Sequence, residues 1–260
     1  SAMRERSIGI GALGWHAYLQ KNNVAWESPM AIGRNKTIFR HIRISLNEAN
    51  QQLGKERGEA PDAKGTGNRF SHLMAIAPNA SSSIIMGNTS PSIEPYRANA
   101  YRQDTLSGAF LNKNKFLDNI IKQKITENDK LDYDEIWSSI IANDGSVQHL
   151  DFLDDWTKDV FKTSMEIDQR WIIEHAADRQ EYIDQAQSLN VFFRPAANIK
   201  YLHAVHFQAW KQGLKTLYYC RSEKLAKADK VSKKIERQVI QELDLKALAS
   251  TEEVCLACEG

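Results

Sequence analysis

Two adjacent tyrosines near the end of the sequence could carry out electron transfer. Tyr218 and Tyr219 belong to Lys215–Cys220, a stretch whose β-branched and aromatic residues predict a strand. Successive side chains of a strand point to opposite faces of the sheet, so a regular strand would separate the two rings. The ordinary interpretation is a pair of aromatic residues in a core strand. The alternative is two phenols stacked in series as a redox pair.

A cysteine pair at the extreme C-terminus could carry out thiol chemistry. Cys255 and Cys258 form a C-x-x-C that is followed only by Glu259 and Gly260. Two neighbouring thiols on a flexible tether suit thiol–disulfide exchange, in which one thiol attacks a disulfide and the other resolves the mixed intermediate. The same pair could supply two zinc ligands, but the remaining ligands are not evident. A stand-alone dithiol oxidoreductase is disfavoured because no helix can follow Cys258 to lower the pKa of the thiols.

A loop of small polar residues could bind an anion. Within His72–Pro95, the apolar run His72–Ala77 predicts a buried strand, and Pro78 ends it. The residues that follow, Asn79, Ala80, Ser81 and Ser82, are small and precede a short apolar run. The first turn of a helix there would offer unpaired N–H groups to an anion. An ordinary serine-rich helix cap is the competing interpretation.

The composition excludes several classes of protein. The 260 residues carry a formal net charge of +1, so the chain lacks the basic excess expected of a nucleic-acid-binding protein. No apolar run approaches the length of a membrane span, and the N-terminus lacks a secretory signal, so we expect no membrane association. Three cysteines, Cys220, Cys255 and Cys258, are too few for a disulfide scaffold, which favours a reducing, cytoplasmic location.

Helices must position these candidate residues, because helical periodicity dominates the sequence. The longest helix is predicted at Met30–Arg57, with Ser28 as N-cap and Pro29 at the first helical position. Glycines near the N-terminus, among them Gly9 and Gly11, predict a helix that packs closely on a neighbour. The remaining helices are expected at Asn114–Lys124, Asp132–Ala142, Leu153–Thr163, Glu166–Ala176, Gln180–Ser188 and Ile199–Leu214, and further strands at Asn190–Arg194 and near Ala98–Tyr101.

Two groups of potential metal ligands have more ordinary explanations. His203 and His206 share a predicted helix face, but without a third ligand nearby, packing or surface placement is the better interpretation. The carboxylates between Asp151 and Asp168 lack a companion E-x-x-H pair, so we interpret them as a solvated face. The sequence therefore predicts no metal site.

Taken in order, these segments resemble the C-terminal part of the large (alpha) subunit of class I ribonucleotide reductase. The resemblance rests on the long helix, the strand with its Pro-x-x-Ser-Ser loop and Ile-Glu-Pro, the segments IDQAQSLN and GLKTLYY, and a tail ending in a cysteine pair. It runs from RERSIGIGALGWHAYL through nearly the whole chain. It implies an α/β fold: residues 1–220 would form the second half of a ten-stranded barrel with many surrounding helices, and residues 221–260 a mobile tail.

The resemblance also implies roles for the candidate residues. Asn79, Ala80, Ser81 and Ser82 match the loop that binds the diphosphate of a ribonucleoside diphosphate substrate, although many relatives carry a carboxylate where this chain has Ala80. Tyr218 and Tyr219 match the tyrosines that relay a radical towards an active-site cysteine. Cys255 and Cys258 match the tail cysteines that reduce the active-site disulfide and are recharged by thioredoxin or glutaredoxin.

Other parts of the reductase are expected outside this sequence. The thiyl-radical cysteine, its two reducing cysteines and the Asn and Glu that assist at the sugar have no counterpart here. We therefore expect activity only with the N-terminal half of the large subunit and a radical-generating, metal-containing small (beta) subunit. This chain itself would bind no cofactor. The alternative to a reductase is a non-catalytic module that binds a nucleotide phosphate or a partner subunit.

Overall fold

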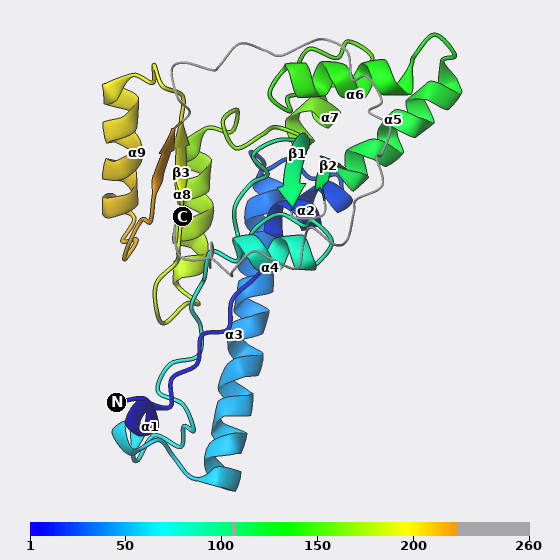
Figure 1. Cartoon of the computed structure of the whole chain (residues 1–260). Helices are drawn as coiled ribbons and strands as arrows, with labels where there is room; N and C mark the ends of the chain where they lie inside the picture. The colour runs from blue at the N-terminus through cyan, green and yellow to red at the C-terminus, as the bar shows by residue number, and fades with distance from the viewer. Residues whose placement is uncertain (106–107, 223–260) are drawn as a thin grey trace, which may run out of the picture. The chain divides into compact units, whose positions relative to one another are not determined.

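The computed structural model describes residues 1–105 and 108–222 (Figure 1). Of the predicted tail, residues 223–260, with Cys255 and Cys258, lie outside the described residues. Helices dominate the described part, and the parallel pairing of segments far apart in the sequence confirms the α/β class. None of the described helices is both long enough and apolar enough to cross a bilayer.

The long helix α3 spans Pro29–Arg57 and confirms the sequence prediction. The Ser28 side chain accepts a hydrogen bond from the Ala31 N–H at 3.2 Å and so caps the helix. The first helical position tolerates Pro29 because a backbone N–H there would have no acceptor within the helix. Near its end, Gly54 allows close packing, since a Cβ at this position would lie 1.9 Å from the carbonyl oxygen of Gly67.

Four extended segments pair in parallel beside this helix. The Ile10 N–H donates to Leu73 O at 2.8 Å, and the Ile76 N–H donates to Ala186 O at 3.1 Å. The last pair is formed by β3 (Val191–Phe193) and β4 (Cys220–Ser222). The predicted strand at His72–Ala77 is thus extended, but it makes only single-residue bridges, at Met74 and Ile76.

Three predictions of secondary structure were wrong. The residues of the predicted helix Gln180–Ser188 form turns and then an extended segment after α8 (Gln169–Gln180), because the N–H groups of Gln185 and Ser188 donate to the carbonyl oxygens of Met74 and Ile76. The strand predicted at Lys215–Cys220 begins only at Cys220. Gly9 and Gly11 do pack closely, against Ala75, but from an extended segment that precedes α2 (Trp15–Lys21) rather than from a helix.

A β-hairpin follows the candidate loop, and its second strand was not predicted. Strands β1 (Ala100–Thr105) and β2 (Gly108–Lys113) pair antiparallel, with Ala100 opposite Lys113 (Figure 1). The sequence shows only weak strand character here because its residues are largely polar. The base of the hairpin is fixed by buried Asn114, whose Nδ2 donates to Gln20 Oε1 at 2.8 Å.

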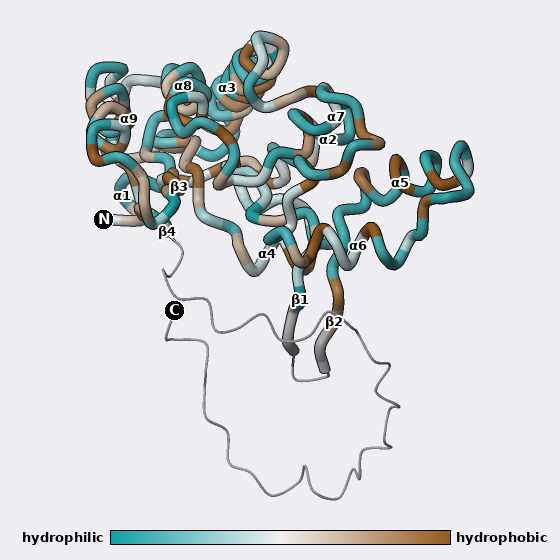
Figure 2. Tube along the Cα trace, turned by 90° about the horizontal axis from the view of Figure 1, so that it is seen from above, coloured by the Kyte–Doolittle hydropathy of each residue, from teal (hydrophilic) through white to brown (hydrophobic). Residues whose placement is uncertain are grey.

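The apolar side chains form two clusters. The larger cluster joins α2, α3, α8, β3 and α9 (Ile199–Lys211) and includes Trp26, Phe39, Met74 and Ile173. The smaller cluster joins α5 (Lys115–Glu127), α6 (Tyr133–Ala142) and α7 (Asp155–Val160). Brown and teal segments alternate along α5 and α6 in Figure 2, as expected of amphipathic helices. The short elements α1 (Ala2–Glu5), η1 (Pro61–Ala63) and α4 (Ala80–Ile85) complete the described part.

Two of the acidic residues interpreted as a solvated face, Asp154 and Asp168, serve as helix caps. Asp154 accepts a hydrogen bond from the Thr157 N–H at 2.8 Å at the start of α7, and Asp168 accepts one from the Arg170 N–H at 3.0 Å at the start of α8. Glu166 accepts from the N–H of Thr163 at 2.8 Å. Their carboxylates are therefore used in local structure.

Candidate functional site

The loop predicted to bind an anion begins the short helix α4. Asn79 has a positive φ of 53° and precedes the helix without a side-chain cap. The first backbone bond of the turn is donated by the Ser83 N–H to Asn79 O at 3.0 Å. The N–H groups of Ala80, Ser81 and Ser82 therefore have no acceptor within the helix. These three residues are exposed, so a ligand can reach the free N–H groups and the two serine hydroxyls.

The segment that follows α4 is anchored to α2. The Ala17 N–H donates to Ser90 Oγ at 3.0 Å, and the Tyr96 N–H donates to His16 Nδ1 at 2.9 Å. Burial lowers the pKa of His16 to about 3, so the imidazole stays neutral and keeps Nδ1 as an acceptor. Gly14 is required at the start of α2, because a Cβ there would lie 2.6 Å from Thr89 Oγ1. The loop thus rests on a rigid support.

The two tyrosines lie against each other. The ring centroids of Tyr218 and Tyr219 are 4.1 Å apart and the ring planes are inclined by 52°. Both rings are about half exposed. The opposite-face arrangement expected of a regular strand is therefore wrong, because the two residues precede β4 and do not alternate. The two rings are in contact but tilted rather than stacked, and their interpretation as a redox pair stays a prediction.

Polar groups surround the tyrosine pair. A hydrogen bond with the Tyr219 phenol raises the pKa of Tyr218. The guanidinium of Arg221 lies 4.5 Å from the centre of the Tyr219 ring, a cation–π contact. Beneath the pair, buried Glu94 Oε1 accepts a hydrogen bond from Asn190 Nδ2 at 2.6 Å, and Asn190 Oδ1 accepts from the Tyr219 N–H at 3.1 Å.

Sequence reasoning missed Glu94 and Asn190 as site residues. Both occur in the segments that carry the family resemblance, Ile-Glu-Pro and IDQAQSLN, but neither was assigned a role. A carboxylate in an otherwise apolar and proline-flanked stretch was the available signal, because a buried charge needs polar partners. Cys220 is a free, exposed thiol.

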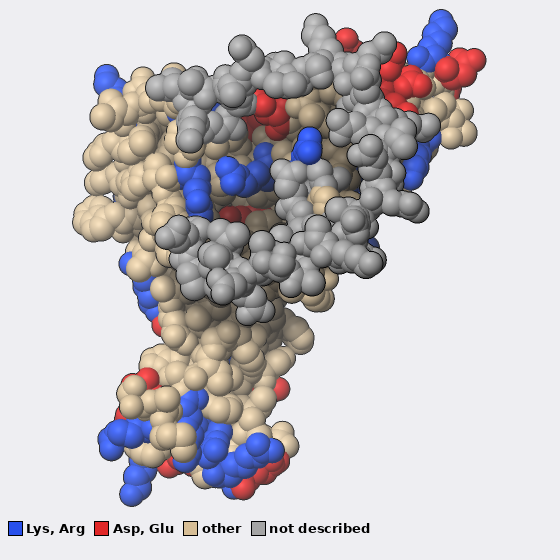
Figure 3. Space-filling model, viewed as in Figure 1, with Lys and Arg blue, Asp and Glu red and all other residues tan. Residues whose placement is uncertain are grey.

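Packing or surface placement was predicted for the two histidines of α9, and His206 takes part in packing while His203 is exposed. His206 stacks on Phe193 with centroids 6.2 Å apart, and its Nδ1 lies 2.8 Å from Leu202 O. His203 stacks on Phe207 at 6.0 Å within an exposed aromatic stripe that continues to Trp210. The surface over α9 is mostly uncharged in Figure 3.

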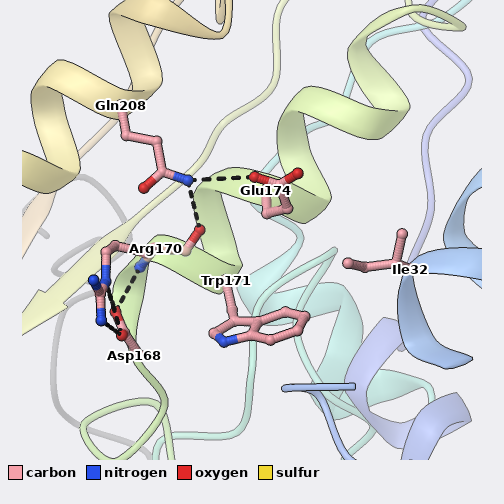
Figure 4. A pocket seen from close by; sticks show the side chains of 6 residues that line it. All are labelled: Ile32, Asp168, Arg170, Trp171, Glu174 and Gln208. Carbon is pink, nitrogen blue, oxygen red and sulfur yellow. Dashed lines mark hydrogen bonds and ion pairs between the residues drawn. The ribbon is translucent and has the colours of Figure 1, made fainter. Parts of the chain in front are cut away.

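A hollow of about 400 Å³ between α3, α8 and α9 contains none of the predicted site residues. Its polar groups bind one another: Gln208 Nε2 donates to Glu174 Oε2 at 3.3 Å and to Arg170 O at 3.4 Å, and Arg170 pairs with Asp168 (Figure 4). Trp171 and Ile32 form the rest of its wall. We therefore assign no chemistry to this hollow.

Comparison with known proteins identifies the fold. The ribonucleotide reductase barrel domain family matches two overlapping stretches of the chain, residues 1–66 and 60–220. Among solved structures, the class Id ribonucleotide reductase alpha subunit of Actinobacillus ureae superposes with a TM-score of 0.78 at 44% sequence identity, covering 85% of this chain and 40% of that one.

Curated relatives carry the same assignment. The large subunit of ribonucleoside-diphosphate reductase from Invertebrate iridescent virus 6 is 56% identical over 234 residues, which are 89% of this chain and 24% of that protein. The corresponding subunit of Invertebrate iridescent virus 3 is 52% identical over 260 residues, or 100% of this chain and 40% of that protein. The chain thus spans a quarter to two fifths of the length of these relatives. With the parallel α/β arrangement described above, these matches show that the chain belongs to the ribonucleotide reductase barrel domain family.

Proposed function

We propose that this chain contributes to a ribonucleoside-diphosphate reductase, which reduces ribonucleoside diphosphates to deoxyribonucleoside diphosphates for DNA synthesis. Within that enzyme it would supply a substrate loop, a radical relay and a tail dithiol. The observation that carries the proposal is the tyrosine pair: in a chain of this family, the centres of two phenol rings lie 4.1 Å apart where a regular strand would have separated them.

The substrate loop would bind the diphosphate through the free N–H groups of Ala80, Ser81 and Ser82. Backbone donors at a helix start and small hydroxyls suit phosphate oxygens, and the small side chains allow close approach. With Ala80 in place of a carboxylate, the loop adds no negative charge next to the substrate. Its role is to hold the substrate, since none of its side chains is an acid or a base.

The tyrosine pair would pass a radical from the small subunit towards the active-site cysteine. In each step the phenol of one tyrosine loses one electron and one proton and becomes a phenoxyl radical. The neighbouring phenoxyl takes up both and becomes a phenol. Ring contact between Tyr218 and Tyr219 supports such a transfer, because the electron and the proton then move over short distances.

The tail cysteines would restore the active site after each turnover. The thiolate of one cysteine attacks the active-site disulfide and forms a mixed disulfide. The other cysteine then displaces it, which leaves a reduced active site and a Cys255–Cys258 disulfide. Thioredoxin or glutaredoxin would reduce this disulfide in the cytoplasm. The radical would come from a metal-containing small subunit, and the active-site cysteines from the N-terminal half of the large subunit.

Reconstitution tests the proposal. The complete large subunit containing this sequence is mixed with its small subunit, thioredoxin and a ribonucleoside diphosphate, and deoxynucleotide formation is measured. We expect turnover in the parent protein and none in Tyr218→Phe or Tyr219→Phe, with nucleotide binding retained in both. Binding without any turnover in the parent would favour the non-catalytic binding module instead.

A further inference from the structure

We propose that Glu94 and Asn190 are positioning residues that hold Tyr219 in register with Tyr218 for radical transfer. This inference rests on the radical relay of the proposed function. It concerns residues that touch neither substrate nor the radical-carrying rings, and that act through the backbone of Tyr219.

The hydrogen-bond ladder contains one extra residue at the tyrosine pair. The pairing of Val191 with Cys220 would, in a regular parallel ladder, direct the Tyr219 N–H to Leu189 O. Instead the Tyr218 N–H takes Leu189 O at 2.8 Å, while the Val191 N–H still binds Tyr219 O at 2.9 Å. Two residues thus occupy the place of one, as in a β-bulge. The strict alternation of side chains is broken there, which explains why both rings lie together.

The bulge leaves the backbone N–H of Tyr219 without a main-chain acceptor in the ladder. The side chain of Asn190 supplies the acceptor. The Tyr219 N–H donates to Asn190 Oδ1 at 3.1 Å. An N–H group left without an acceptor at this partly buried position would destabilise the bulge in favour of the regular ladder. A regular ladder would turn one of the two rings to the opposite face.

Glu94 fixes the orientation of the asparagine amide. Asn190 is only 5% exposed and Glu94 only 7% exposed, so neither group can exchange its partner for bulk water easily. The Asn190 Nδ2 group donates to Glu94 Oε1 at 2.6 Å. Rotating the amide by 180° would set Oδ1 against the carboxylate and Nδ2 against the Tyr219 N–H, and both contacts are repulsive. The carboxylate therefore keeps Oδ1 directed at Tyr219.

The arrangement connects two distant parts of the sequence. Glu94 follows the substrate loop in the segment anchored to α2, whereas Asn190 and the tyrosine pair belong to the β3–β4 ladder. A substitution at Glu94 should therefore act on Tyr219 through Asn190.

The test uses the complete large subunit with 3-aminotyrosine at position 219, which traps the radical there. After mixing with the small subunit and substrate, electron paramagnetic resonance measures the radical yield and the β-methylene hyperfine splitting, which depends on ring orientation. We expect Asn190→Ala to shift the splitting. In the protein with natural tyrosine, it should lower kcat about ten-fold, the effect of losing one such hydrogen bond, with KM for the nucleotide unchanged.

Two further variants separate positioning from general destabilisation. Glu94→Gln keeps an acceptor oxygen for Asn190 and should retain the parent splitting, whereas Glu94→Ala should shift it as Asn190→Ala does. Asn35→Ala is the matched control: it also removes a fully buried asparagine amide, one that donates to His175 O at 2.8 Å, and it should leave the splitting unchanged.

The outcomes distinguish the two proposals. If Tyr219→Phe abolishes turnover but Asn190→Ala changes neither the splitting nor kcat, the positioning role is refuted while the relay stands. A shift in Glu94→Gln as large as in Glu94→Ala would also refute the role given to the acceptor oxygen. If Tyr219→Phe turns over normally, the relay itself is wrong.

Discussion

Two buried histidines should make the stability of this chain start to fall at a pH above the range in which carboxylates titrate. Burial lowers the pKa of both His16 and His175 to about 3, and the positive charge of Arg179 adds to the effect on His175. In the unfolded chain each imidazole has its ordinary pKa of about 6.5. The unfolded state therefore binds more protons, and stability falls as the pH drops from 6.5 towards 3.

The size of the effect follows from these pKa values. At pH 5 an unfolded histidine is almost fully protonated while the buried one is neutral, which destabilises the fold by about 2 kcal/mol per histidine relative to pH 8. The two together amount to about 4 kcal/mol, a large part of the stability of a domain. Neutral His16 accepts a hydrogen bond from the Tyr96 N–H at Nδ1. In protonated His16 this nitrogen would carry a hydrogen, which would point at the Tyr96 N–H and break the bond.

Urea unfolding measures this loss of stability. The free energy of unfolding is determined at pH 8 and at pH 5 for the parent chain and for His175→Gln. The Gln amide can take the place of His175 Nε2, which lies 3.1 Å from Trp26 O, but it cannot be protonated. The variant should lose about 2 kcal/mol less than the parent between the two pH values, because all other titrating groups are shared. Histidine C2–hydrogen exchange gives the pKa of His175 directly. Equal losses in parent and variant, or a His175 pKa near the ordinary value of about 6.5, would refute the reasoning.

Three further predictions concern the proposed reductase. The double variant Cys255→Ser and Cys258→Ser should complete a first turnover at the normal rate but stop with thioredoxin as reductant; unaffected multiple turnover would contradict the tail shuttle. Ser81→Trp should raise KM for the nucleotide about ten-fold or more by blocking the exposed loop, and an unchanged KM would exclude the loop from the substrate site. Arg221→Gln removes the cation 4.5 Å from the Tyr219 ring, so it should lower the reduction potential of that tyrosine and raise the fraction of trapped radical there; a lower fraction would show that the cation–π contact does not oppose oxidation.

The parts of the fold that depend on local sequence could be predicted. Helix α3 was found with its cap because Ser28, Pro29 and the apolar periodicity all act within a few residues of one another. The helix predicted at Gln180–Ser188 failed for the opposite reason. Backbone N–H groups of this segment donate to the carbonyl oxygens of Met74 and Ile76, more than 100 residues away. This pairing overrides the local helical preference.

The candidate site also contains one part that local sequence predicts and one part that depends on distant residues. Free N–H groups before Ser83 are a property of any helix start, so Ala80–Ser82 could be identified as a possible anion site from residue types alone. The contact between the tyrosine rings could not be derived from strand alternation, because it depends on a bulge whose unpaired N–H group finds its acceptor 29 residues earlier in the sequence. A resemblance between sequences identified the pair, and only the structure gives the cause of its geometry.

The proposed substrate loop and the proposed relay are parts of one mechanical unit. The segment 79–95 begins with the loop, is pinned to α2 through Ser90, and ends with Glu94 bound to Asn190. Asn190 in turn holds the backbone of Tyr219. A nucleotide that ordered the exposed start of α4 would therefore act on a segment whose far end is fixed beneath the tyrosine pair. Because the hydrogen bonds of this unit are short and largely buried, we expect substrate binding to change the trapped-radical spectrum at position 219, and to do so less in Glu94→Ala. An identical substrate effect in Glu94→Ala would show that the two sites respond independently.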